Sequence, residues 1–283
     1  MVLEQLYSAA WIEQKTRYAF LMGVSYSIVG IVAAMLIFPQ DPGMIAITFT
    51  SLLILPSLIK LISIEENEAA RKNKFNFRQL FSEHGDIMKV YIFMFLGIML
   101  AFAFFSIVWP QIATSQIFSQ QASIFGSIGT GQATAIEQSA GSFFWSILQN
   151  NLLVLVICLV LSLAYGAGSI FIITWNASVW GVVFGLIAKN SAAVAGSNPF
   201  WIFLLTFIAV FPHLILEALS YILAAISGGI VSTAVIREKV FSNRFNQIIQ
   251  DGLMLFILSI VVLFVAAYLE VFVAGFVVSL FGL

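Results

Sequence analysis

Long apolar segments take up most of this sequence, and they leave few structures open to it. About 20 consecutive apolar residues cross the hydrocarbon core of a bilayer as an α-helix. A helix satisfies its backbone N–H and C=O groups within one segment, whereas lipid offers them no partners. The seven predicted spans are 18–38, 44–64, 90–109, 143–165, 169–187, 200–236 and 252–281. We therefore expect an all-α polytopic transmembrane helix bundle of about seven spans, a multi-pass protein of the cell membrane.

Composition agrees with membrane embedding and contact with membrane lipids. Charged residues make up 9% of the chain, against roughly 25% in soluble domains. The net charge of −1 gives no basis for nucleic-acid binding. The single cysteine, Cys158, excludes an intramolecular disulfide. The sequence holds no His-Glu-x-x-His motif, Walker loop or Gly-x-Gly-x-x-Gly fingerprint, so we expect no catalytic residue, metal or cofactor.

Residues 1–17 form a separate N-terminal segment in this prediction, and the bundle takes up residues 18–283. Apolar residues recur in the first segment at three-to-four spacing, which is typical of an amphipathic helix. Two placements stay open. The helix lies flat in the membrane interface with Trp11 as its anchor, or it packs as a lead-in to the first span.

Two longer stretches separate the spans. Residues 65–89 carry most of the charge, and they predict a short amphipathic helix or a folded loop at the surface. Residues 110–142 are polar with interspersed apolar side chains, and Glu137 is their one charged residue. We expect this second stretch to rest on the membrane surface or to pack over the bundle.

Positive charge is distributed unevenly between the two ends of the spans. With the N-terminus in the cytoplasm and seven crossings, ten basic residues fall inside: Lys15, Arg17, Arg71, Lys72, Lys74, Arg78, Lys89, Arg237, Lys239 and Arg244. Only Lys189 falls outside. The positive-inside rule therefore predicts a cytoplasmic N-terminus and a C-terminus on the outer side.

The run 200–236 contains proline, histidine and glutamate close together. It is longer than one crossing needs, so it either extends into the cytoplasm or divides at Pro212 into a re-entrant half-helix and a full helix. Because proline lacks an N–H and clashes with the preceding turn, we expect a kinked or broken helix at Pro212. His213 and Glu217 are four residues apart and share one face. They make a polar site or hinge, or a hydrogen bond that pins two helices together.

Further polar residues lie inside the predicted spans. We assign five of them to a structural polar core: Asn150, Asn151, Asn176, His213 and Glu217. Small residues such as Gly181 and Gly228 permit close helix approach, so we expect spans 143–165, 169–187 and 200–236 to contact one another through these groups. The polar core is interhelical glue, a substrate or proton path, or an enzyme site. Glu270 faces a wet cavity or lies near the outer interface.

This arrangement resembles the stage II sporulation protein M family of integral membrane proteins. The resemblance covers residues 143–236 and rests on these elements: Asn150-Asn151, Gly166 and Gly168, Asn176 with Gly181, Pro212-His213 with Glu217, and the glycines near 228. Two positions depart from the family pattern, Ala177 and Leu214, where the family usually has glycine. The resemblance implies a membrane subunit of a complex that, in spore-forming bacteria, drives membrane migration with cell-wall hydrolases.

The function predicted from sequence is a non-catalytic membrane scaffold or assembly subunit of a membrane complex. Protein partners would dock on residues 65–89 or 110–142, and a homo-oligomer is left open. The alternative is a transporter or channel component that uses the His213–Glu217 pair within the membrane. A third hypothesis is an intramembrane enzyme acting on lipid or peptide.

Overall fold

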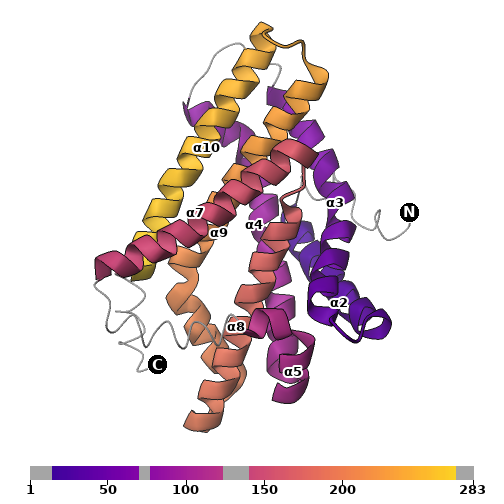
Figure 1. Cartoon of the computed structure of the whole chain (residues 1–283), viewed down its shortest axis with the longest axis vertical. Helices are drawn as coiled ribbons and strands as arrows, with labels where there is room; N and C mark the ends of the chain where they lie inside the picture. Colours follow the sequence, from indigo (N-terminus) through magenta and orange to yellow (C-terminus); the bar gives the residue numbers. More distant parts are fainter. Residues whose placement is uncertain (1–14, 70–76, 124–139, 272–283) are drawn as a thin grey trace.

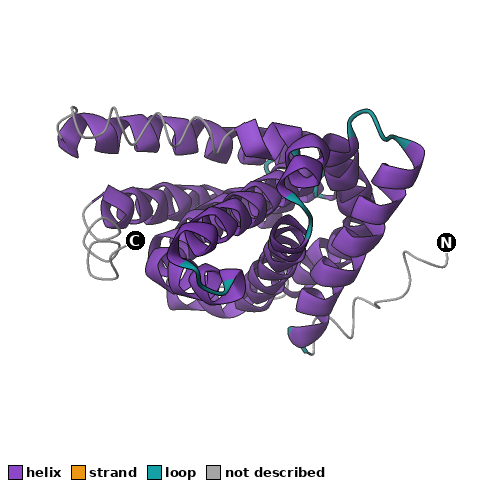
Figure 2. Ribbon diagram, turned by 90° about the horizontal axis from the view of Figure 1, so that it is seen from below, coloured by secondary structure: helices purple, strands orange, loops and turns teal. Residues whose placement is uncertain are grey.

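The computed structural model describes residues 15–69, 77–123 and 140–271 (Figure 1). The helices are α2 (Arg17–Ile37), α3 (Pro42–Ala69), α4 (Phe77–Val108), α5 (Gln111–Ile117), α7 (Ala140–Tyr165), α8 (Ile170–Ala195), α9 (Pro199–Arg237) and α10 (Asn243–Leu269). All except α5 are long and apolar enough to cross a membrane. Figure 2 shows helices joined by loops and no strand in these described ranges. The predicted all-α bundle with seven spans is confirmed.

The charged stretch 65–89 differs from its prediction. α3 continues to Ala69 and α4 already begins at Phe77, so most of the stretch forms the ends of two long helices. Glutamate, lysine and arginine have high helix propensity, and a helix therefore continues beyond its apolar part. Residues 70–76 lie outside the described residues. So do residues 1–14, which carry most of the predicted N-terminal amphipathic helix.

The first part of the stretch 110–142 packs against the bundle. α5 follows Pro110, and the buried Phe118 ring lies 5.5 Å from the Phe102 ring of α4, measured between centroids. Gln121 is also buried, and its Nε2 lies 3.5 Å from Ser178 Oγ on α8. Of the two predicted placements, packing over the bundle therefore holds for this part. Residues 124–139 lie outside the described residues.

α9 is one continuous helix of 39 residues with Pro212 inside it. Of the two predicted alternatives, one long helix with an extension therefore holds, and division into a re-entrant half-helix and a full helix does not. Proline is tolerated within spanning helices, because neighbouring groups satisfy the carbonyl that loses its partner. At 1.5 Å per residue α9 is about 58 Å long, nearly twice the ~30 Å hydrocarbon core, so it crosses once and extends beyond.

α9 is also the central helix of the bundle. It contacts α3, α4, α7, α8 and α10, and every residue from Ser220 to Ile230 is buried. A helix that is buried all round lies in the core of a large assembly of helices. The other spans are therefore positioned by what they pack against on α9.

Small residues let the neighbouring helices approach α9 closely. A methyl group added at Gly228 would lie 2.6 Å from the Leu159 carbonyl oxygen and 2.7 Å from Ser162 Cβ on α7. On α10, the Gly252 carbonyl accepts a 2.7 Å hydrogen bond from Ser227 Oγ. Gly181 was also expected to take part in contacts among these spans. It packs instead against the backbone of Met99 on α4.

We predict that Gly228→Ala lowers the thermal stability of the purified protein in detergent. The added methyl group meets backbone atoms that cannot rotate away, so α7 must shift, at a cost of about 1–3 kcal/mol. Gly85→Ala in α4 is the matched control, since a Cβ there has nothing within 4 Å. Alanine at that helical position should be neutral or slightly stabilising. Equal melting temperatures for the two variants would contradict the close α7–α9 contact.

Candidate functional site

Pro212, His213 and Glu217 lie on α9 as the sequence predicts, but the two polar side chains have different partners. Both are buried, with 4% of each exposed. The His213 ring meets Trp180 of α8 edge to face, with 6.3 Å between centroids. Glu217 Oε1 accepts a 3.0 Å hydrogen bond from the Tyr221 hydroxyl. The alternative of a His213–Glu217 hydrogen bond therefore does not hold, because the carboxylate is bonded to Tyr221.

The direction of side chains on a helix explains this pairing. Side chains lean toward the helix N-terminus, so a long residue reaches the residue one turn before it. Tyr221 lies four residues after Glu217 and therefore brings its hydroxyl to the carboxylate. A buried carboxylate without a donor is costly, and the phenol supplies one.

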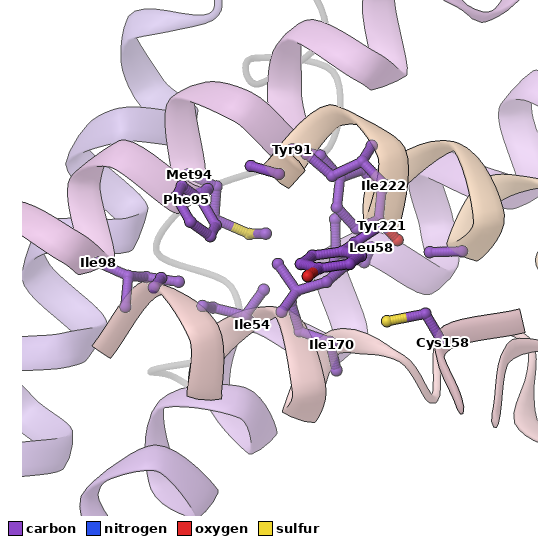
Figure 3. Close-up of a cluster of buried hydrophobic side chains, with 14 of the residues drawn as sticks. Ile54, Leu58, Tyr91, Met94, Phe95, Ile98, Cys158, Ile170, Tyr221 and Ile222 are labelled. Carbon is purple, nitrogen blue, oxygen red and sulfur yellow. The ribbon is translucent and has the colours of Figure 1, made fainter. Parts of the chain in front are cut away.

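Tyr221 connects this carboxylate to the centre of the bundle. Figure 3 shows the Tyr221 ring among apolar side chains that come from several helices. They include Leu58 of α3, Tyr91 of α4 and Ile170 of α8, and the Cys158 thiol of α7 belongs to the same cluster. Tyr221, which holds Glu217, thus lies where α3, α4, α7, α8 and α9 converge.

Glu270, at the end of α10, is the second carboxylate of this region. It is half-buried and interacts electrostatically with Glu217 and Tyr221. Like charges repel strongly where the dielectric constant is low. A cation bound near both carboxylates would relieve this repulsion, so the pair is the part of the site most suited to chemistry.

The three asparagines of the predicted polar core lie apart from this site. Asn151 is buried and accepts a 3.2 Å hydrogen bond from Nδ2 of the exposed Asn150. Asn176 Nδ2 donates at 2.8 Å to the Ile172 carbonyl on its own helix. Among the described residues, none of these amides is hydrogen-bonded to His213 or Glu217. The ranges that the structure describes also hold no group of three His, Cys, Asp or Glu side chains placed for a metal ion.

Sequence reasoning missed Tyr221 and Trp180. A signal for Tyr221 was present, because a phenol four residues after a carboxylate in an apolar run can satisfy it. Trp180 had no signal of this kind. Its contact with His213 depends on how α8 and α9 cross, and residue spacing on one helix carries no information about that crossing.

We predict that Tyr221→Phe lowers the melting temperature more than Tyr91→Phe does. The first change leaves the buried Glu217 carboxylate without its donor, at a cost of about 1–3 kcal/mol. Tyr91 is equally buried, and its hydroxyl is not the donor to Glu217. Thermal unfolding of both variants in the same detergent makes the comparison. Equal losses would show that the hydroxyl of Tyr221 is not what holds Glu217.

Comparison with known proteins places this arrangement in a family. No curated protein and no solved structure matches the chain. The family model described as stage II sporulation protein M matches residues 90–275, from within α4 to beyond α10. The match includes Glu217, Tyr221 and Glu270, and it is wider than the region of resemblance in the sequence. This multi-pass membrane protein therefore belongs to the stage II sporulation protein M family.

Proposed function

We propose that the protein is a non-catalytic scaffold, an assembly subunit of a membrane complex. The proposal rests on one observation: polar groups within the spans form hydrogen bonds to other groups of the same chain. Glu217 is held by Tyr221, Ser227 by the Gly252 carbonyl and Asn176 by its own helix. Side chains that are satisfied within the protein serve its structure rather than a substrate, and the Ser227 bond also joins α9 to α10.

Partners of such a scaffold would dock where helices extend beyond the bilayer. α3 has 28 residues and α4 has 32, which correspond to about 42 Å and 48 Å against a ~30 Å hydrocarbon core. The charged stretch 65–89 joins these two helix ends. It presents both acidic and basic residues, which suits a polar, charged protein surface.

The charge distribution supports a cytoplasmic position for this stretch. The ten basic residues of one side favour it by the positive-inside rule. Lys189, the one lysine of the other side, donates to the Trp109 carbonyl just after α4 ends. Its charge is thus engaged at a helix C-terminus, where a cation is favoured. We propose a cytoplasmic N-terminus and an outer C-terminus.

A same-length Gly/Ser replacement of residues 70–76 tests the docking proposal. Cross-linking in the native host, purification in mild detergent and mass spectrometry should find a stoichiometric partner with the wild type and lose it with this variant. The control is Lys239→Gln with Arg244→Gln on the same predicted side, which should keep the partner. A reporter fused after Leu283 should be active outside in all three. The proposal would be contradicted if the variant kept the same partners as the wild type. A reporter that places Leu283 in the cytoplasm would contradict the topology.

A second candidate function is a transporter or channel component. It is favoured by two observations: Glu217 lies in α9, the spanning helix that contains Pro212, and Glu270 interacts with it electrostatically. Transporters bind their coupling ions at polar groups near such irregular helices. Under this candidate, the carboxylates would carry a proton or a cation across the bilayer.

This candidate predicts that Glu217→Gln abolishes a pH-dependent flux in reconstituted vesicles. The glutamine still offers an oxygen to Tyr221, so the fold should persist, but it cannot exchange a proton. Glu238→Gln is the control, because Glu238 follows α9 and pairs with Arg244 at 2.9 Å. Flux that is the same in wild type and Glu217→Gln would remove the transporter candidate.

A further inference from the structure

α7 is the span least covered by the rest of the protein. Only 28% of its membrane window is buried, the smallest share among the seven spans. Figure 1 shows α7 running obliquely across the bundle, and its main contacts are with α9 and α10. One side of α7 therefore faces away from the protein along its whole length.

Two amide side chains lie on this uncovered side, well inside the span. Gln149 and Asn150 are exposed, and they lie about 14 Å along the axis from the first residue of α7. No other exposed asparagine or glutamine in the described ranges lies more than about two turns inside a spanning helix. An amide that faces hydrocarbon costs free energy unless it has a hydrogen-bond partner.

The contacts within the chain leave most of this hydrogen-bonding capacity unused. An amide side chain offers two N–H donors and one carbonyl oxygen. Asn150 donates one N–H to Asn151 Oδ1. Gln149 has no side-chain hydrogen bond among the described residues. The Gln149 side chain thus keeps its N–H donors and its carbonyl acceptor unused on the uncovered side of α7.

Gln149 belongs to a continuous exposed stripe with the spacing of a helix–helix contact. Its residues follow one another by four and three positions, and each is exposed: Ser142, Ser146, Gln149, Leu153, Val156, Val160 and Leu163. Alternation of three and four is the repeat of left-handed helix pairs. Small residues at one end of this α7 stripe permit close approach, and the Gln149 amide supplies hydrogen bonds.

We propose that the α7 stripe is the interface of a homodimer, with α7 of one copy packed in parallel on α7 of a second. A twofold axis normal to the membrane brings each residue to the same depth as its own copy. Gln149 then meets Gln149, and because an amide both donates and accepts, the pair is self-complementary. A second α7 offers the same stripe, so the small residues meet small residues and the amide meets an amide. This inference does not rest on the scaffold proposal.

Cysteine cross-linking in native membranes tests the dimer. The natural thiol, Cys158, is fully buried, so the wild type serves as the blank. Leu153→Cys and Val160→Cys place thiols on the stripe, at 61% and 53% exposure of the native side chains. Val261→Cys on α10 is the matched control, since Val261 is also 53% exposed. Oxidation should give a dimer with the two stripe variants and none with the control.

A second set of variants tests the amide directly. Gln149→Leu should weaken dimerisation by about tenfold, as expected for the loss of an interhelical amide bond, and Gln149→Asn should weaken it less. The side chain is exposed, so the melting temperature of the monomer should not fall. Monomer alone, a cross-link to a different protein, or equal yields from Val261→Cys would each overturn the proposal.

Discussion

The close packing of α7 and α10 on α9 is the constraint on which the rest of the bundle depends. In lipid no hydrophobic effect drives helices together, so association rests on close contact and on hydrogen bonds between them. At Gly228 the backbone of α7 comes so near that no side chain fits, and at Ser227 a hydroxyl bonds the backbone of α10. Two consecutive residues of α9 thus fix its neighbours on two sides.

Polar groups within the spans are mostly satisfied independently of this packing. Most of them turn inward or toward their own helix. Ser220 and Thr233 donate to carbonyls of α9 itself, and Asn176 does so on α8. Glu217 uses Tyr221 from the next turn. Local partners satisfy these groups wherever the helices lie, so the polar residues do not by themselves determine the packing.

This explains what could be predicted from sequence. The spans follow from runs of apolar residues, because one segment satisfies its own backbone, and the seven predicted spans are confirmed. The ends of α3 and α4 were missed, since a helix outside lipid depends on propensity rather than hydropathy. At the site, the burial of His213 and Glu217 was foreseeable. Their partners were not, because Trp180 belongs to another helix and Tyr221 competes with His213 for one carboxylate.

α7 is the exception to the inward arrangement of polar groups. If polar groups in a membrane protein face inward, then an amide that faces outward marks a surface that is inward in a larger assembly. Asn150 and Asn151 are neighbours in the sequence, yet one is exposed and the other buried against the bundle. Only the structure separates them, because a helix turns by about 100° at each residue. The sequence analysis treated Asn150 and Asn151 as a single feature. In the structure, one side chain faces the bundle and the other faces away from it.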